Sequence, residues 1–224
     1  MKSATSSIGK GTWRYEITAE GCWYIFQYPE HQLFEETVEK DICFGPLNFN
    51  YSETEAKKRA YEMLELVGLS KEVMQKSPFA LSGGQMRRVA IAGVLASEPK
   101  VVVLDEPTAS LDPIGRKEMM ELFTNYQREH QATIVLVTHQ MDEVVAYAKR
   151  VLVMDQGEIV LDGTPKDIFS QSHTLQQLGL DIPPVLQLAE KVKNRFDLND
   201  WPALFDEEEL AEQIVSWIRS RRGT

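Results

Sequence analysis

Two short stretches of the sequence combine residue types that handle phosphate groups and metal ions. The first is Leu-Ser-Gly-Gly-Gln at residues 81–85, directly before a segment with helical periodicity. Ser82 is a favourable helix N-cap, and Gly83 and Gly84 allow backbone N–H groups to approach an anion closely. Because the helix dipole adds positive potential there, the stretch predicts a phosphate-binding helix start, with a plain capped loop as the alternative.

The second stretch delivers two adjacent carboxylates at the end of an apolar run. Val101–Leu104 predicts a strand buried on both faces of a parallel sheet, and Asp105 and Glu106 follow it directly. Ligands of α/β sheets bind at this carboxyl edge. One carboxylate there can hold Mg²⁺, and its neighbour can activate water for attack on a γ-phosphate. The alternative is a strand that ends in an ordinary polar turn.

Two further residues follow apolar segments. His139 comes after the apolar strand predicted at 133–137, near the same sheet edge, and Gln27 follows Tyr24-Ile25-Phe26. A single histidine at a strand end is more often structural, and a single glutamine is weak evidence.

The elements that must position these residues alternate along the chain. Apolar periodicity predicts helices over 54–67, 84–96, 115–129 and 141–149. Continuous apolar runs predict strands at 101–104 and 133–137, and residues 151–154 and 158–161 predict a hairpin around Asp155-Gln156-Gly157. This order predicts an α/β fold with a mostly parallel sheet under helical cover.

The pattern changes after Leu161. Thr164, Pro165 and Asp167 form a predicted helix start with a capping box, and residues 206–222 have acids first and bases last. The sequence thus predicts an atypical segment at 1–21, a core at 22–164 with a helical subdomain at about 30–95, and a helical appendage at 165–224.

Composition excludes several classes of protein. With 24 Lys+Arg and 34 Asp+Glu the net charge is −10, which argues against a general nucleic-acid binder. The apolar share of 43% is ordinary globular usage, and no run is long and apolar enough to span a bilayer. The start lacks the apolar stretch of a secretion signal, and Cys22 and Cys43 are expected to be free thiols.

The order of the motifs resembles the ATPase subunits of ABC transporters. Gln27, the 81–85 stretch, Asp105-Glu106, Ser110-Leu111-Asp112 and His139 stand where that family has its Q-loop, signature motif, Walker B, D-loop and H-loop. Residues 26–34 and 39–46 further resemble the ATPases of energy-coupling factor (ECF) transporters, which import vitamins and transition-metal ions. The resemblance covers residue 22 to at least residue 180 and implies a P-loop NTPase-like fold.

The resemblance implies a role for each matched residue. Asp105 and Gln27 would bind Mg²⁺, Glu106 would be the catalytic base, Gln27 would also position the attacking water, and His139 would contact the γ-phosphate of ATP. A last group would act at the nucleotide site shared with an opposing subunit: Ser82, Gly83, Gly84, Gln85 and Asp112.

One element of the family pattern is missing. The phosphate-binding loop G-x-x-x-x-G-K-[ST] would precede Gln27, but the single Gly-Lys pair, Gly9-Lys10, has Ala4 and Gly11 at the two key positions. Three interpretations remain open: a truncated or frame-shifted start, a degenerate subunit that lends only its signature motif to a partner, and a remodelled loop in which Lys10 weakly contacts nucleotide. The first is favoured, so the N-terminal part of the fold is expected to be incomplete.

The expected function is ATP binding and hydrolysis for an ECF-type importer. The expected partners are a second ATPase subunit, a transmembrane coupling subunit and a substrate-binding membrane component, at the cytoplasmic face of the membrane. Phe34, Val38 and Phe44 are expected either to pack under the helical subdomain or to line the socket for the membrane subunit. The non-catalytic interaction subunit stays open as an alternative, whereas residues 28–46 argue against a soluble ATPase of DNA repair or translation.

Overall fold

The computed structural model describes residues 21–196, 198 and 207–222. The chain divides into two compact units, residues 1–137 and 138–224. The boundaries expected from sequence at 21/22 and 164/165 stay predictions.

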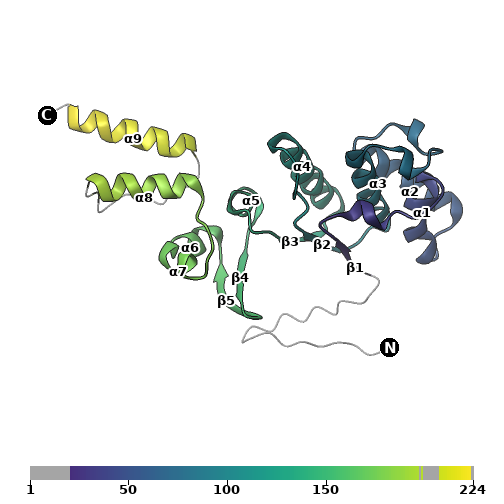
Figure 1. The fold of residues 1–224 in the computed structure, drawn as a ribbon, viewed down its shortest axis with the longest axis horizontal. Helices are drawn as coiled ribbons and strands as arrows, with labels where there is room; N and C mark the ends of the chain where they lie inside the picture. Colours follow the sequence, from purple (N-terminus) through teal and green to yellow (C-terminus); the bar gives the residue numbers. More distant parts are fainter. Residues whose placement is uncertain (1–20, 197, 199–206, 223–224) are drawn as a thin grey trace. The chain divides into compact units, whose positions relative to one another are not determined.

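A parallel sheet organises the first unit (Figure 1). Its described strands are β1 (Cys22–Ile25), β2 (Val101–Asp105) and β3 (Thr133–Val137), in the order β1-β2-β3. Tyr24 pairs with Val103, and Asp105 pairs with Val137. Parallel pairing brings the carboxyl ends of all three strands to one edge of the sheet.

Two helices cover one face of this sheet. The helices α3 (Gly83–Leu95) and α4 (Pro113–His130) pack with Ile25, Val102 and Leu104 in a single core. The predicted helices over 84–96 and 115–129 are thus confirmed within a residue or two. The expectation that residues 101–104 are buried on both faces is wrong, because the side chains that alternate with this core stay partly or well exposed: Tyr24, Val101, Val103, Val135 and Val137.

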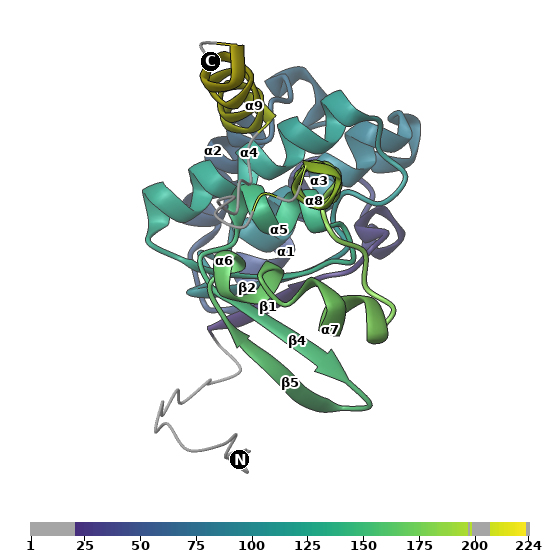
Figure 2. The same cartoon turned by 90° about the vertical axis from the view of Figure 1, so that its left-hand side faces the viewer.

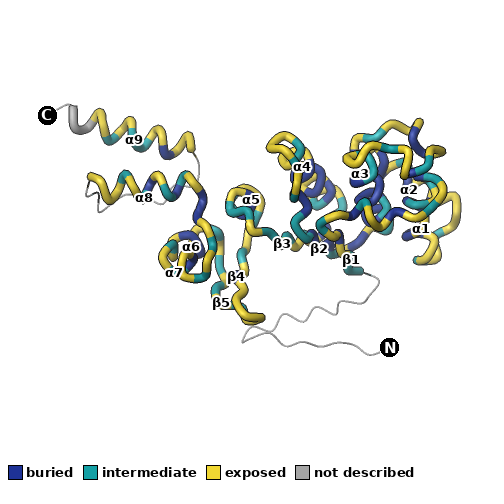
Figure 3. The backbone as a smooth tube through the Cα atoms, viewed as in Figure 1, coloured by how far each residue is buried: buried dark blue, intermediate teal, exposed yellow. Residues whose placement is uncertain are grey.

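Two more helices complete the first unit. They are α1 (Val38–Asn48) and α2 (Glu53–Leu66), followed by short 3-10 helices at Lys71–Val73 and Pro78–Ala80; another lies at Pro29–Gln32. The helix predicted over 54–67 is α2, and its expected inner face is buried: Ala56, Ala60, Met63, Leu64 and Val67. Figure 3 shows the buried residues concentrated where α1, α2 and α3 pack together.

The second unit begins with α5 (Met141–Tyr147) and a hairpin of β4 (Val151–Asp155) and β5 (Glu158–Gly163). Figure 2 shows the two hairpin strands as a separate antiparallel ribbon. Gln156 and Gly157, between the strands, have φ of 47° and 86°. Positive φ at both turn residues matches the twist of the flanking strands, so the hairpin prediction is confirmed.

Helices follow the hairpin: α6 (Pro165–Phe169), α7 (Ser172–Gln177), α8 (Pro184–Phe196) and α9 (Glu207–Arg222). The capping box predicted at the start of α6 is present, with Thr164 and Asp167 bonded reciprocally. A small core joins α6, α7 and α8 to the hairpin, and it includes Val153, Ile168 and Phe169. Among the residues described, no helix has the length and apolar character to cross a bilayer.

Candidate functional site

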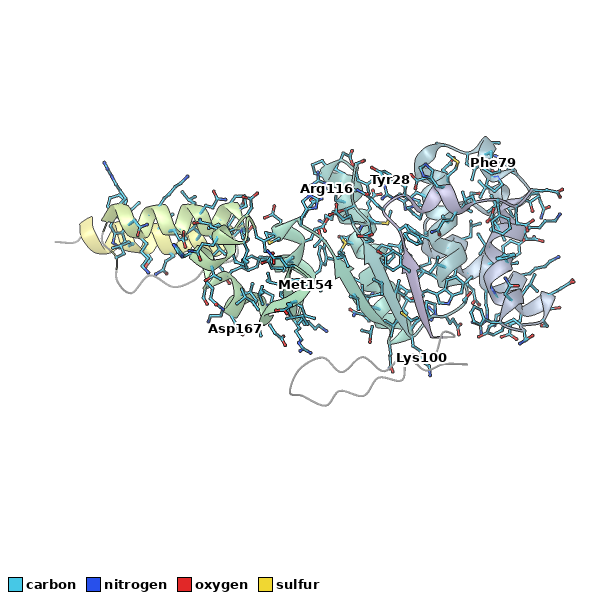
Figure 4. The ribbon with its side chains drawn as sticks, turned by 60° about the horizontal axis from the view of Figure 1, so that its bottom comes forward. Tyr28, Phe79, Lys100, Arg116, Met154 and Asp167 are labelled. Atoms are coloured by element: carbon cyan, nitrogen blue, oxygen red, sulfur yellow. The ribbon has the colours of Figure 1, made fainter. Side chains whose placement is uncertain are left out.

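Three of the predicted chemistry-bearing residues of the first unit lie at the carboxyl edge of the sheet. Asp105 is the last residue of β2, Glu106 follows it, and Gln27 comes two residues after β1. Figure 4 shows Tyr28 and Arg116 at the end of the sheet where the strands finish, and Lys100 at the opposite end. Parallel topology therefore places these side chains where α/β sheets bind ligands.

The Asp105 carboxylate is half-buried and already has one hydrogen-bond donor. The Tyr24 hydroxyl donates to its Oδ2 at 2.7 Å. This hydrogen bond, together with burial and the charge of Asp105, raises the pKa of the Tyr24 phenol above its usual 10.0. Tyr24 thus stays protonated and holds the carboxylate in one orientation.

Glu106 begins a loop with an unusual backbone. Its N–H donates to the Val137 carbonyl at 2.9 Å, and its own carbonyl accepts from Ala109 at 3.0 Å. Glu106 and Ser110 have φ of 46° and 65°, a region that costs energy for residues other than glycine. Such strain is concentrated at functional sites, where the surrounding structure enforces it.

The 81–85 stretch forms the start of α3 as predicted. Ser82 is the N-cap, its Oγ accepts from the Gln85 N–H at 3.3 Å, and the Gln85 side chain accepts from the Ser82 N–H at 3.1 Å. Gln85 therefore has a capping role within its own chain. A methyl group added at Gly83 or Gly84 would meet no atom within 4 Å, so the chain's own packing does not require glycine there.

Asp112 also has a local structural role. It caps α4, and its carboxylate accepts from the Gly115 N–H at 2.7 Å. Arg116, one turn into α4, donates from Nε to the Leu111 carbonyl at 3.0 Å. Leu111 and Asp112 are thus held by hydrogen bonds from the first turns of α4.

Sequence reasoning missed Arg87. This side chain on α3 is only 5% exposed, and it donates to the Gln27 carbonyl at 2.8 Å and to the Ala109 carbonyl at 3.1 Å. Periodicity gave a usable signal, because Arg87 shares a helical face with the buried Ala90, Ile91 and Val94.

His139 belongs to the second unit, in the turn between β3 and α5, and it is exposed. The preceding Thr138 holds this turn: its Oγ1 donates to Glu143 at 2.9 Å and accepts from the Gln140 N–H at 3.0 Å. Lys10, the remaining candidate, lies outside the described residues.

A groove opens beside the start of α1. It encloses about 220 Å³ and is lined mainly by apolar side chains, among them Trp23, Leu33, Phe34, Phe44 and Val94. Phe34 and Phe44 are 56% and 45% exposed and meet edge to face, with ring centroids 4.8 Å apart. Val38 is fully buried in the core, so of the two alternatives left open by the sequence it follows the packing one.

The donor set at the sheet edge suits a hard cation that shares its ligands with a phosphate. Across the described part of the chain, no cluster of three or more His, Cys, Asp or Glu side chains is placed to hold a metal ion. Mg²⁺ uses one or two carboxylates and takes its other ligands from water and substrate phosphates. Asp105 and the Gln27 amide fit that partial role, and the Glu106 carboxylate is a group that can accept a proton.

Comparison with known proteins agrees with this arrangement. The sequence matches the ABC transporter family over residues 5–109. It is 55% identical over 199 residues to the energy-coupling factor transporter ATP-binding protein EcfA2 of Halalkalibacterium halodurans, covering 89% of this chain and 71% of that protein.

Solved structures give the same answer. CbiO1 of Clostridium perfringens, part of the ABC transporter complex cbiONQ, has a TM-score of 0.62 at 41% identity, covering 77% of this chain and 68% of that one. A dimeric ATP-binding cassette, MJ0796, bound to ADP and Pi has a TM-score of 0.55 at 31% identity, covering 65% and 63%. The chain therefore belongs to the ABC transporter family of ATPases, among the ATP-binding subunits of energy-coupling factor transporters.

Proposed function

We propose that this chain binds and hydrolyses ATP to energise uptake of a vitamin or a transition-metal ion through an ECF-type importer. The observation that carries the proposal is that a single folded unit presents Asp105-Glu106 at its sheet edge and an open, glycine-led N-terminus on α3. The carboxylates of Asp105 and Glu106 can act on a γ-phosphate, and the N-terminus of α3 can bind one.

The proposed roles follow from the chemistry of each group. Asp105, held by Tyr24, keeps its second oxygen for Mg²⁺, and the Gln27 amide would complete the protein's share of the ligands. Magnesium would neutralise charge on the phosphates. The Glu106 carboxylate would accept a proton from the attacking water, and the His139 imidazole would contact the γ-phosphate.

The signature residues are proposed to act on nucleotide held by a second ATPase subunit. Since neither Gly83 nor Gly84 is needed for internal packing, their small size suits the close approach of a phosphate from outside the chain. The dimeric assembly of the related cassette MJ0796 supports this arrangement. Asp112, at the neighbouring helix start, is proposed to meet the opposing subunit across the dimer.

The groove beside α1 is proposed to receive the transmembrane coupling subunit. An exposed aromatic pair over an apolar floor suits a short amphipathic helix. Such docking would place this chain peripherally on the cytoplasmic face of the membrane, beside the coupling subunit and the substrate-binding component.

The decisive experiment is Glu106→Gln in the assembled transporter. Removal of a general base costs about 10²–10⁴ in rate, so turnover should nearly vanish while bound ATP is retained. Glu118→Gln, an exposed carboxylate on α4, is the matched control and should keep wild-type turnover. Near-normal hydrolysis in Glu106→Gln would remove Glu106 from the mechanism.

A separate experiment tests the groove. Phe34→Asp should abolish co-purification with the membrane subunit and leave the melting temperature close to wild type, because Phe34 is well exposed. The control is Phe79→Asp, which changes another well-exposed aromatic, outside the groove. Unchanged co-purification in Phe34→Asp would locate the docking site elsewhere.

A second candidate function is a non-catalytic subunit that contributes only its signature motif. The observation that bears on it is the open space around Gly83 and Gly84 at the start of α3, which suits a phosphate held by another chain. Calorimetry on the 224-residue chain tests for a phosphate ligand within it: weak ATP binding that is indifferent to Lys10→Ala would leave Ser82, Gly83 and Gln85 as its main nucleotide contacts, made in trans. Micromolar binding that Lys10→Ala abolishes supports the first candidate and makes Lys10 a phosphate ligand.

A further inference from the structure

Arg87 joins three segments that the proposed mechanism treats separately. It lies on α3, the helix that Ser82 caps, and its guanidinium reaches the Gln27 and Ala109 carbonyls. Gln27 follows β1, and Ala109 lies three residues after Glu106. One side chain therefore connects the loops that carry the proposed metal ligand and the proposed base.

The geometry of this contact requires a guanidinium. One terminal nitrogen, Nη2, donates to Gln27 at 2.8 Å, and the other, Nη1, donates to Ala109 at 3.1 Å. Because the two donors are held in one rigid plane, the spacing between the two carbonyls is fixed. A lysine ammonium keeps the charge but is a single point donor and lacks this fork.

Stability alone does not explain an arginine here. Burial lowers the pKa of the Arg87 guanidinium, and the charge of Glu30 opposes that shift. Arg87 Nε and Glu30 Oε2 are both buried without a hydrogen-bond partner in the described part of the chain. Since a buried guanidinium with one nitrogen unpaired is costly, the two hydrogen bonds to the Gln27 and Ala109 carbonyls are what favour an arginine on this helical face.

We propose that Arg87 is a positioning residue that locks the Gln27 loop and the 106–111 loop together against the signature helix. The three segments then move as one body when ATPase subunits close. Holding the Ala109 carbonyl also helps to maintain the left-handed conformations of Glu106 and Ser110 on either side of it. The functional consequence rests on the proposed function, whereas the mechanical connection does not.

Arg88 supplies a matched control on the same helix. Its guanidinium donates to the Val67 carbonyl at 2.8 Å and pairs with Glu118 at 2.7 Å. Arg88 thus ties α3 to the end of α2 and to α4, and it contacts neither of the two loops. Loss of Arg88 tests what general loosening of α3 does.

The first experiment measures amide hydrogen exchange on the full chain for Arg87→Lys, Arg87→Met and Arg88→Lys. Both Arg87 variants should accelerate exchange in 26–31 and 106–111 together, by about tenfold or more, as the loss of a charge-assisted hydrogen bond implies. Arg88→Lys should leave both loops at the wild-type rate. If Arg87→Met fails to fold, Arg87→Lys alone decides. The proposal is overturned if the Arg87 variants accelerate exchange in neither loop or in only one of them. It is also overturned if Arg88→Lys accelerates exchange in both loops as much as the Arg87 variants do.

The second experiment measures ATP hydrolysis by the assembled transporter. Arg87→Lys should lower kcat by about tenfold or more per assembled complex, with KM for ATP within about twofold, because the positioned groups act on the reacting phosphate more than on nucleotide affinity. A rise in KM at constant kcat would contradict this role. Absence of hydrolysis in the wild-type complex would instead contradict the proposed function and leave the exchange result standing.

Discussion

The Tyr24 hydroxyl donates a hydrogen bond to the Asp105 carboxylate, 2.7 Å away on the neighbouring strand. The two residues are 81 positions apart in sequence, and the parallel pairing of β1 with β2 brings them together on the same face of the sheet. The proposed metal ligand is therefore oriented by a side chain from the strand that leads to Gln27.

Tyr24→Phe should remove a contribution to stability that is present at neutral pH and is lost at alkaline pH. The pKa of Tyr24 is raised in the folded chain, so the bond stabilises the fold fully below the ordinary value of 10.0 and is lost as pH rises through the raised value. A single hydrogen bond contributes about 0.5–1.5 kcal/mol to the free energy of unfolding. Since this hydroxyl is near solvent, the variant should lose an amount at the lower limit of that range at pH 8. Urea unfolding at pH 8 and pH 10.5 measures both effects.

Tyr28→Phe is the control for this experiment. Tyr28 is exposed to a similar extent, and its ring stacks on His31. Tyr28→Phe removes a hydroxyl but keeps the bond between Tyr24 and Asp105, so its unfolding curves are the reference for Tyr24→Phe. If Tyr24→Phe and Tyr28→Phe have identical stability curves, the bond to Asp105 contributes nothing measurable.

The local sequence pattern was enough to predict most helices and strands, but it did not predict how the strands align with one another. The apolar runs at 101–104 and 133–137 identify β2 and β3, and Ser82 and Thr164 mark helix starts, because capping depends on residues three apart. The contact between Tyr24 and Asp105 depends on how β1 aligns with β2. No local signal fixes that alignment.

The candidate site divides in the same way. The types and order of Asp105, Glu106 and Gln27 indicate their chemistry, and strand topology then gathers them at one edge. Arg87 has no motif of its own, and a lone arginine on a helix is usually solvated. The sequence left two alternatives for Val38 because an apolar residue between charges can face either the core or the groove, and only the packing shows that it faces the core.

Cys43 should react far more slowly than Cys22 with a thiol reagent. Burial raises the pKa of Cys43 to about 11, with a smaller contribution from the charge of Glu39. At pH 8 only about one Cys43 thiol in a thousand is then ionised, and the thiolate is the reactive form. Single-thiol chains made by Cys22→Ser and Cys43→Ser allow each rate to be measured by itself.

The same pKa predicts the pH dependence of stability at this position. The raised value means that the neutral Cys43 thiol stabilises the fold fully below the ordinary value of 9.0, and that this stability is lost as pH rises towards 11. Cys43→Ala should abolish that loss. The labelling rates of the two single-thiol chains in urea serve as the reference and should be equal. If the rates are also equal under native conditions, Cys43 is accessible to the reagent.

Tyr126→Phe should stabilise the chain. The side chain is fully buried on α4, and its hydroxyl has no hydrogen-bond partner among the described residues. Removing an unsatisfied buried hydroxyl relieves a cost of about 1 kcal/mol or more, and phenylalanine keeps the ring stacked on His130. Thermal unfolding with Tyr61→Phe, a half-buried tyrosine, as control measures the gain.

The alkaline behaviour of Tyr126 provides a second check. Burial, and to a lesser extent the charge of Glu98, raise the pKa of Tyr126 above 10.0, so the wild-type chain loses stability as pH rises beyond that value. The Tyr126→Phe chain should lose less over the same range. A destabilised variant with unchanged pH dependence would show that the hydroxyl is satisfied in solution.

Gly83→Ala should separate stability from function. Gly83 is the first residue of α3 and has open space around it, so alanine, the better helix former, should raise stability by up to about 1 kcal/mol. The added methyl group would occupy the surface that is proposed to approach a nucleotide on the opposing subunit. ATP-driven dimerisation should therefore weaken while the melting temperature stays level or rises.

Gly45→Ala is the contrasting control. A methyl group there would lie 2.5 Å from Ser97 Oγ and 3.3 Å from the Gly93 carbonyl, so this variant should lower the melting temperature. The same Gly→Ala substitution is thus expected to lower stability at Gly45 and to raise it at Gly83. Normal ATP-driven dimerisation of Gly83→Ala would mean that the N-terminus of α3 does not meet nucleotide, and the signature role would then have to be assigned elsewhere.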